Sequence, residues 1–393
     1  MASTTLSPNH LARSAAALVA RPVAFADIPR ATWDRLLAAT ESRTPFSRWT
    51  LHRAWWDAYG GTAHEQYLVV GPAGATAEDF DAAVAIVPLM HRHEIEPDDA
   101  KCRTSVRPHE STGTAVPGEA KAVFFGASYH ADYATVLTDS GHLPAVATAI
   151  ADYFTQPPDS AHGTKDWDVV DLRRLRSADP VLTSLEAALR ETGAEPGWRV
   201  VRELEDVCPV FTAPSADWDE YLATLHKKAR HEIRRKLRRA ADVGALTVEI
   251  VAPTVEAIDA FIELHRARFG EDGLFPDNPG GARSRTFIHR LGELELEAGE
   301  SERQLHVGLV RCSGQVIYAM LAFDDGQTCF LYNAGMDPAA REASPGVSGA
   351  ALYFQDRMAA GRRRFDFLRG NEPYKYEWGA VDEPIERLLV TRA

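Results

Sequence analysis

The chain has 393 residues, a length at which two domains are expected. Its content of 45% hydrophobic and 25% charged residues is typical of a globular protein. No apolar run approaches the roughly 18 residues of a membrane-spanning helix, and the formal net charge of −13 disfavours a general affinity for nucleic acid. Four widely spaced cysteines without a Cys-x-x-Cys pair argue against a zinc site and a disulfide framework, so we expect a reducing, cytoplasmic setting.

The start of the chain, residues 1–22, is expected to be disordered. It contains no Asp or Glu, and its short patch Ala15–Ala20 is less apolar than the core of a signal peptide. A first domain over 23–208 then alternates helices and strands. Helices are expected over 31–39, 51–59 and 144–154, and strands over 66–70, 83–90, 123–126, 134–137 and 167–172.

Two segments of this domain that contain histidine have a chemical interpretation. His91 and His93 end one strand on the same side, but no third and fourth ligand accompanies them, so no metal is expected. His130 and Asp132 flank Tyr133, and one interpretation places an acceptor pocket between the two halves of the chain there.

The second domain is expected over 209–393, because prolines and short polar residues interrupt the pattern between Glu203 and Trp218. Near its start, eight Lys or Arg residues fall between 227 and 239, and apolar residues recur at steps of three and four: Leu222, Leu225, Ala229, Ile233 and Leu237. This spacing predicts an amphipathic helix with a cationic face. That face either receives an anion, such as a phosphate of a carrier, a nucleotide or a tRNA, or simply stays solvated.

The remaining elements predict a mixed sheet with helices. The expected order is a strand over 246–251, helices over 254–268 and 284–297, a β-meander over 305–312, 315–324 and 328–334, a helix over 346–360 and a strand over 365–368.

The start of the helix over 346–360 is a candidate phosphate site. Ser344 suits the N-cap and Pro345 the first helical position, and Gly346 and Gly349 leave backbone N–H groups bare. Such a helix tip can hold a pyrophosphate, as in coenzyme A, although an ordinary helix start would look similar. The run 346–350 is a near miss to Gly-x-Ser-x-Gly, but it does not follow a strand as a nucleophile elbow requires.

The segment 365–379, FDFLRGNEPYKYEWG, carries most of the information. A short apolar strand runs into a glycine turn and then into aromatic residues around one lysine. Aromatic walls exclude water and strengthen the effect of a fixed charge on a reacting group, although the same residues would also suit the packing of a buried strand end.

A strand ending in Asp-Phe-x-x-Gly, followed by Tyr-Lys-x-x-Trp-Gly, resembles the C-terminal signature of the Fem-like branch of the GNAT acyltransferase superfamily, in particular the CelD-type acetyltransferases. The resemblance covers residues 215–390 well and the first half loosely. It implies an α+β fold of tandem GNAT-like domains, each a mixed, mostly antiparallel central sheet flanked by helices.

The resemblance also implies roles for individual residues. Lys375 matches a lysine that supports charge at the reaction centre, Tyr374 would donate a proton to the leaving group, and either Glu372 or Asp366 would act as base. The acyl donor would bind at Tyr332, Asn333, Ser344, Gly346, Ser348 and Gly349. The substrate would contact Arg369, Trp378, Arg230 and Arg234.

We therefore expect an enzyme that moves an acyl group directly from acetyl-CoA or another acyl-CoA to an amine or hydroxyl of a small or carbohydrate-like acceptor. The loop that begins at Arg341 departs from the usual GNAT spacing, and some Fem-like proteins use aminoacyl-tRNA instead of acyl-CoA. An aminoacyl-tRNA-dependent transferase is thus the alternative, and a non-catalytic binding protein is a third. We expect no membrane contact and favour a monomer.

Overall fold

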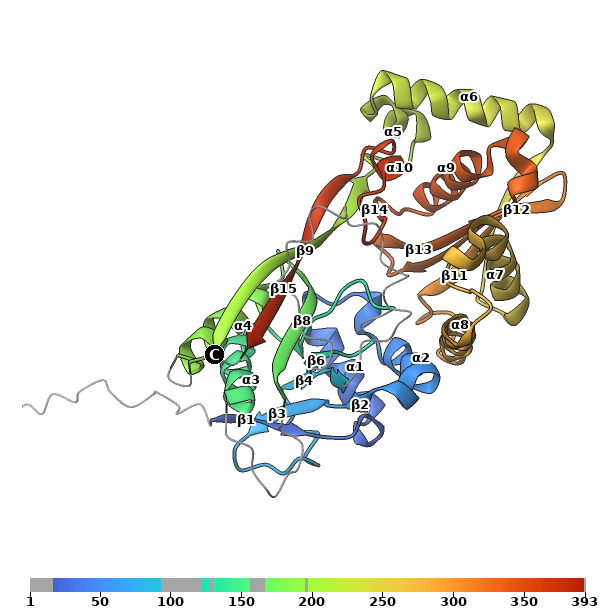
Figure 1. Cartoon of the computed structure of the whole chain (residues 1–393). Helices are drawn as coiled ribbons and strands as arrows, with labels where there is room; N and C mark the ends of the chain where they lie inside the picture. Colours follow the sequence, from blue (N-terminus) through green and yellow to red (C-terminus); the bar gives the residue numbers. More distant parts are fainter. Residues whose placement is uncertain (1–16, 93–121, 128–129, 156–166, 195–196, 392–393) are drawn as a thin grey trace, which may run out of the picture.

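The computed structural model describes residues 17–92, 122–127, 130–155, 167–194 and 197–391. Its main feature is an eleven-stranded sheet that runs through both halves of the chain, with the strand order β10-β11-β12-β13-β14-β9-β15-β8-β6-β5-β2 (Figure 1). A second sheet in the first half has the order β1-β3-β4-β7.

Among its described residues, the first half contains eight strands and four α-helices. These elements are β1 (Leu18–Pro22), α1 (Arg30–Ala39), α2 (Trp49–Tyr59), β2 (His64–Glu65), β3 (Leu68–Pro72), β4 (Ala85–Val87), β5 (Leu89–Arg92), β6 (Ala122–Phe125), β7 (Leu137–Thr138), α3 (Leu143–Thr155), β8 (Val169–Arg176) and α4 (Pro180–Thr192). Strand β8 pairs parallel with β6, whereas the other pairs of this half are antiparallel.

The second half repeats this order after two additional helices. Its elements are α5 (Trp218–Thr224), α6 (Lys227–Val243), β10 (Leu246–Val251), α7 (Val255–Phe269), α8 (Pro279–Glu297), β11 (Leu305–Cys312), β12 (Gln315–Asp324), β13 (Thr328–Met336), α9 (Pro345–Ala359), β14 (Arg364–Asp366) and α10 (Pro373–Tyr376). Strand β14 pairs parallel with β13, in the same way that β8 pairs with β6. The α+β fold of two mostly antiparallel units, predicted from the sequence, is confirmed.

Two long strands join the halves. Strand β9 (Arg199–Thr212) pairs with β14 at one end, and β15 (Val381–Thr391) pairs with β9 along its length and with β8 of the first half. Figure 1 shows this pair crossing from one half to the other. The predicted division at 208/209 therefore falls within a strand that both halves share.

Packing between α2 and α8 also links the halves. Tyr59 and Phe287 are fully buried and meet edge to face at 6.5 Å. At the other end of the same contact, Arg48 Nη1 lies 2.7 Å from Oε1 of the buried Glu295. Removing one partner of such a pair leaves a buried charge uncompensated, so the interface is sensitive to substitution.

Several expectations need correction. Residues 18–22, expected to be disordered, form β1, because their backbone pairs antiparallel with β3. The strand expected over 83–90 is divided into β4 and β5 at Pro88, which has no N–H to give to a ladder. The sequence reading also missed α4, α5, α10, β9 and β15.

Among the residues described, no helix has both the length and the apolar character needed to cross a membrane. Cys208, Cys312 and Cys329 are buried free thiols, whereas Cys102 lies outside the described residues.

Candidate active site

In the second half, two neighbouring parallel strands, β13 and β14, separate after a short stretch of pairing, and we call the point where they separate the fork. Strands β13 and β14 pair over three positions, from Thr328 opposite Arg364 to Phe330 opposite Asp366. The chain then turns away from β13, since Leu368 has a φ of 58° and Gly370 a φ of 103°. A side chain at Leu368 tolerates this left-handed backbone only at some cost, which marks the turn as a place where other contacts hold the chain.

A cavity of about 960 Å³ opens at this fork. Its walls come from β12, β13, the start of α9, the segment after β14, the end of α7, one face of α6 and two residues of the first half. Seven aromatic side chains take part: Phe269, Tyr318, Tyr332, Phe354, Phe367, Tyr374 and Trp378. A cleft with a mainly apolar lining and a few polar groups is the usual form of a small-molecule site.

Lys375 supports the turn at the fork. The residue is 3% exposed, and its ammonium donates to the carbonyl oxygens of Leu368, Arg369 and Gly370 at 3.0, 2.7 and 2.9 Å. These three bonds use all the protons of the ammonium. The geometry is that of a side chain that positions the turn, and Lys375 also lines the cavity.

Glu372 and Tyr374 line the cavity beside Lys375. Glu372 Oε2 lies 3.0 Å from Lys375 Nζ, yet this oxygen has no well-aligned hydrogen bond within the described residues. Gly370 gives the carboxylate room, because a Cβ there would lie 2.7 Å from Glu372 Oε2. Tyr374 remains 53% exposed, and partial enclosure together with the Glu372 carboxylate raises the pKa of its phenol to about 12.

Asp366 lies behind the cavity wall. It is 1% exposed and is absent from the lining residues. Its Oδ2 accepts from the Tyr133 hydroxyl at 2.7 Å, and its Oδ1 accepts from the backbone N–H of Leu368 at 2.8 Å. Burial raises the pKa of the carboxyl to about 6. These contacts connect Asp366 to the shape of the fork and give it no direct access to a ligand.

The start of α9 forms one edge of the cavity, with Gly346 in the lining. Ser344 and Pro345 occupy the N-cap and the first helical position, as the sequence predicts. The Val347 and Ser348 N–H groups both bond to the Ser344 carbonyl, and Pro345 has no N–H, so fewer amides face a ligand than at an open helix tip.

The other small residues of this turn have packing roles. Ser348 is buried and donates through Oγ to the Ala343 carbonyl at 2.7 Å. A Cβ at Gly349 would lie 2.7 Å from Cδ1 of Tyr318, so a glycine is needed for α9 to approach β12. Tyr332 and Asn333 of β13 line the cavity, whereas Ser344, Ser348 and Gly349 are not among its lining residues.

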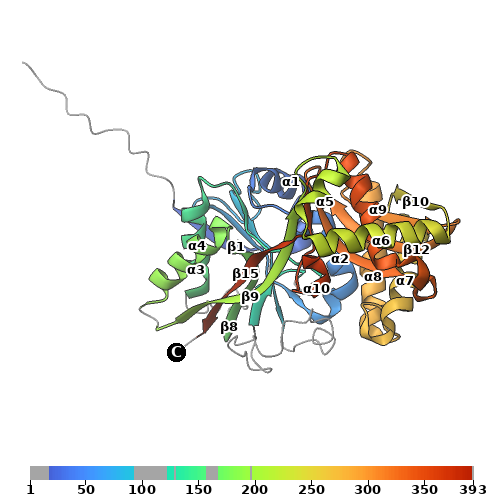
Figure 2. The ribbon, with the colours of Figure 1, turned by 90° about the horizontal axis from the view of Figure 1, so that it is seen from above.

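One face of the basic helix α6 covers the cavity. Figure 2 shows α6 lying across α9 and α10, and the lining residues Lys228, Glu232 and Lys236 recur at steps of four. The expected substrate residues of this helix point elsewhere: Arg234 pairs with Asp219 at 2.7 Å, and Arg230 donates to the Ala223 carbonyl at 3.2 Å. Arg369 and Trp378 do line the cavity.

The end of α7 adds two residues that the sequence reading missed, His265 and Arg268. Burial, followed by the charge of Arg268, lowers the pKa of His265 to about 4, so its imidazole is neutral. The Arg268 guanidinium lies 4.3 Å from the centre of the Phe269 ring. Their spacing of three places both on one face of a helix, which is the only signal the sequence holds for them.

Two residues of the first half close the far end of the cavity. His130 and Asp132 line it, in agreement with the interpretation that a pocket lies between the halves. Asp132 pairs with the Arg369 guanidinium. Although burial alone would lower it, the pKa of Arg369 is raised by the carboxylates of Asp132 and Glu205.

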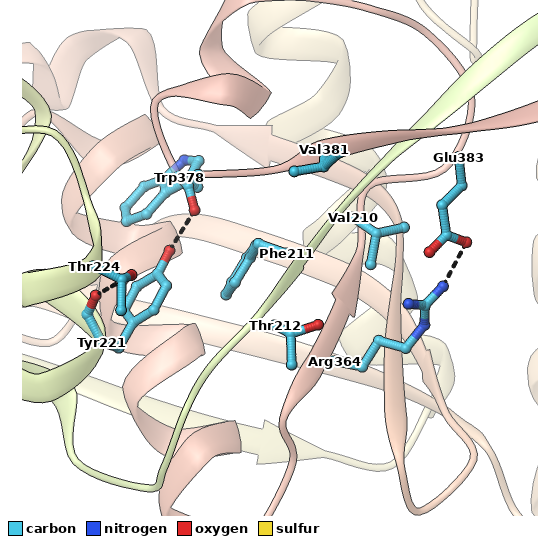
Figure 3. Close-up of a pocket in the computed structure, with 10 residues that line it drawn as sticks. Val210, Phe211, Thr212, Tyr221, Thr224, Arg364, Trp378, Val381 and Glu383 are labelled. Carbon is cyan, nitrogen blue, oxygen red and sulfur yellow. Dashed lines mark hydrogen bonds and ion pairs between the residues drawn. The ribbon is translucent and has the colours of Figure 1, made fainter.

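A second cavity, of about 430 Å³, lies beside Trp378, which also lines the larger one. Figure 3 shows that its polar side chains largely satisfy one another: Tyr221 donates to the Trp378 carbonyl at 2.8 Å, and Arg364 pairs with Glu383 at 2.6 Å. Its small size and internally paired groups make it a poor candidate for chemistry.

No cluster of three or more His, Cys, Asp or Glu side chains suited to a metal occurs within the described ranges. His91 stacks on His64 with ring centres 4.8 Å apart, and His93 lies outside the described residues.

Comparison with protein families adds the deciding observation, because the family model described as an acetyltransferase (GNAT) domain matches residues 227–376. This range contains α6, the fork and α10. Residues 227–376 thus match a GNAT acetyltransferase domain. Over these residues, the resemblance predicted from the C-terminal signature is confirmed.

Solved structures with the same fold extend beyond the GNAT domain. A structure of FemX aligns with a TM-score of 0.57 at 10% identity, over 94% of this chain and 96% of that chain. A conserved protein of unknown function from Bacteroides thetaiotaomicron aligns with a TM-score of 0.54 at 13% identity, over 95% of this chain and 99% of that chain. At such low identity these structures show a common fold, Fem-like and covering both halves. No curated protein sequence matches the chain.

Proposed function

We propose that this protein transfers an acetyl or other acyl group from acyl-CoA to an amine or hydroxyl of a small or carbohydrate-like acceptor. The observation that carries the proposal is the cavity at the fork of a GNAT domain, which is bordered by the tip of α9. An acyl donor and an acceptor can meet there, because the cavity reaches from α9 to the first half of the chain.

The donor's phosphates would lie between the α9 tip and the cavity face of α6. Gly346 exposes backbone there, and Lys228 and Lys236 supply positive charge. Because Val347 and Ser348 already use their N–H groups, these lysines would replace part of the amide cradle of an open helix tip. The residues present therefore fit a diphosphate group.

The chemistry needs a base, a proton donor and a fixed carbonyl. We assign the base to Glu372, which lines the cavity and whose Oε2 is ion-paired with Lys375 at 3.0 Å but has no well-aligned hydrogen bond among the described residues. It would take a proton from the acceptor as the new C–N or C–O bond forms. Tyr374 stays protonated because of its raised pKa, and would give a proton to the thiolate as the C–S bond breaks. No covalent intermediate on the enzyme is needed.

We assign positioning roles to Lys375 and Asp366. Lys375 holds three carbonyl oxygens of the turn, and Asp366 holds the Leu368 N–H from behind. Both residues would fix the positions of Glu372 and Tyr374. Neither would donate a hydrogen bond to the substrate. Of the two candidate bases that the sequence offers, Glu372 and Asp366, the second has less support because it does not line the cavity.

An aminoacyl-tRNA donor is the second candidate. It is favoured by the FemX-like fold and by the exposed cations of α6 that face away from the cavity, such as Arg235. It is opposed by the net charge of −13, which disfavours RNA in general.

Incubation of the purified protein with labelled acetyl-CoA and, separately, with charged tRNA tests both candidates. A panel of amines, including glucosamine, would serve as acceptors. The proposal expects label in an amide or ester product from acetyl-CoA, with no sensitivity to ribonuclease. Transfer from charged tRNA alone, abolished by ribonuclease, would overturn it in favour of the second candidate.

We also propose a cytoplasmic, monomeric protein. The free buried thiols Cys208, Cys312 and Cys329 suit a reducing compartment, and the two halves of the chain already form a cleft between them, which includes His130 and Asp132 of the first half.

A further inference from the structure

A short segment of the first half contacts both strands of the fork in the second half. From this segment, residues 130–133, the His130 Nδ1 lies 2.7 Å from the Tyr332 hydroxyl on β13. The Tyr133 hydroxyl donates to Asp366 at the end of β14, at 2.7 Å. Asp132 pairs with Arg369 in the turn that follows β14. Three contacts thus connect one segment to both sides of the fork.

We propose that residues 130–133 are a positioning element for the GNAT domain, which holds the two strands of the fork apart and forms the acceptor end of the cavity. The part that concerns the acceptor rests on the proposed function. The part that concerns the fork rests on the contacts alone.

The segment is itself held rigidly. His130 is 3% exposed, stacks on Phe287 with ring centres 4.0 Å apart, and places its Nε2 2.8 Å from the Tyr59 hydroxyl. The Tyr59 hydroxyl lies 2.9 Å from Ser284 Oγ on α8. A chain of hydrogen bonds therefore runs from α8 through α2 and His130 to β13, and packed polar networks of this kind specify one geometry.

The backbone of the segment is fixed as well. The Arg174 side chain of β8 donates through Nη1 to the Ala131 carbonyl at 2.6 Å. The backbone N–H of Arg174 donates to Glu205 Oε2 of β9 at 2.7 Å. Arg174 has a φ of 67°, a strained value for this residue type. Strain maintained at the point where the first half touches the fork is consistent with a geometric role.

The alternative role for His130, that of a proton carrier, has less support. Both ring nitrogens lie within hydrogen-bond distance of tyrosine hydroxyls, and burial lowers the pKa of the imidazole to about 3. A buried imidazole of such low basicity is a weak proton acceptor but a good neutral hydrogen-bonding group. His130 therefore acts on the reaction through Tyr332, as a positioning residue.

The fork contacts can be tested with hydroxyl deletions. Tyr133→Phe and Tyr332→Phe each remove one hydroxyl of the segment's contacts. Tyr153→Phe is a matched control, since its hydroxyl accepts from the Gln66 side chain at 2.7 Å elsewhere in the first half. Hydrogen exchange of the whole protein would be followed over 331–336 and 366–370. The proposal expects about fivefold faster exchange there in the two test variants, which is the effect of one lost hydrogen bond, and no change in the control.

A kinetic readout separates positioning from simple stability. With acetyl-CoA as donor and glucosamine as probe amine, Tyr332→Phe should raise the KM for the amine more than the KM for acetyl-CoA. His130→Asn, which keeps a hydrogen-bonding group near the Nδ1 position, should retain more activity than His130→Phe. Equal changes in both KM values and equal activity of the two His130 variants would contradict the acceptor-end assignment.

The positioning of the fork and the proposed acyl transfer can be contradicted independently of each other. Unchanged exchange at the fork in Tyr133→Phe and Tyr332→Phe would overturn the positioning role, whatever the enzyme's activity. If the wild-type protein transferred no acyl group from acetyl-CoA, the proposed function would fail, while faster exchange at the fork would still support the positioning element.

Discussion

The ammonium of Lys375 lies 2.7 Å from the carbonyl oxygen of Arg369, in the turn that separates β14 from β13. A lysine that sequence comparison suggests for catalysis is thus bound to the backbone of the turn. This relationship changes what its substitution should do, because the loss of the ammonium would release the turn as well as any charge near the reaction.

Lys375→Met should therefore lower both stability and activity. The methionine keeps the apolar stem but removes the ammonium donor from three buried or partly buried carbonyl groups, at a cost of roughly 3 kcal/mol in the free energy of unfolding. Chemical denaturation and acyl transfer would be measured together, with the exposed Lys227→Met as control. A variant of wild-type stability that had lost activity would point instead to a direct catalytic charge.

Glu372→Gln should reduce kcat with little effect on stability. A general base contributes typically 10²- to 10⁴-fold, so a loss of about that size is expected in the rate of acyl transfer. Glu263→Gln, at an exposed position of α7, serves as control. Retention of more than half of the wild-type kcat would exclude Glu372 as the base.

Asp366 should make stability depend on pH. Burial raises the pKa of its carboxyl to about 6 in the folded protein, above the unfolded value of about 3.9, so the native state binds the proton more tightly. Its contribution is present at low pH and is lost as pH rises from about 4 to 6, by an amount on the order of 3 kcal/mol.

Asp366→Asn removes this titration while keeping an acceptor for the Leu368 N–H. Unfolding free energies of the wild-type protein and the variant, measured between pH 4 and 7.5, should converge at low pH and separate in favour of the variant above pH 6. Parallel curves across this range would show that Asp366 does not titrate as its burial implies.

Gly349→Ala should destabilise the protein by roughly 1 to 3 kcal/mol, because the added Cβ meets the Tyr318 ring where α9 packs on β12. Helix propensity alone would predict a gain of up to about 1 kcal/mol, so the sign of the effect decides which term dominates. Gly74→Ala, where a Cβ meets no atom within 4 Å, is the control. A more stable Gly349→Ala protein would mean that the two elements pack less closely.

Paired charge deletions on α6 should distinguish its two faces. Lys228→Ala with Lys236→Ala should weaken acetyl-CoA binding by about tenfold, with a smaller effect at high salt, because these lysines line the cavity. Arg230→Ala with Arg234→Ala removes the same formal charge outside it. Titration calorimetry at two ionic strengths would measure both, and equal losses would argue for a diffuse field rather than a local contact.

The local pattern of the second half predicts its elements well. Strand β10 and the first two strands of the meander have the expected bounds, because alternating apolar residues and the turns at Ser313-Gly314 and Asp325-Gly326 act within a few residues of one another. The signature from Phe365 to Gly379 indicates the fork for the same reason: a strand, a turn and an aromatic cluster are contiguous.

Long-range arrangements were harder to predict. Strands β9 and β15 are rich in charged residues and find each other across nearly the whole second half, so no local period reveals their pairing. Charge alone does not distinguish Arg230 and Arg234 from their neighbours, whereas the helix places Lys228, Glu232 and Lys236 on the cavity side. The buried Ala229 and Ile233 could have identified that side, since they lie on the same face.

The central claim is that acyl-CoA binds at the fork of the GNAT domain. Hydrogen exchange of the intact protein with and without acetyl-CoA tests it most directly. The account predicts slower exchange over 331–336, 344–350 and 367–375, with the first strands of the chain unchanged. Absence of protection in these three segments at saturating acetyl-CoA, or protection confined to the first half, would contradict it.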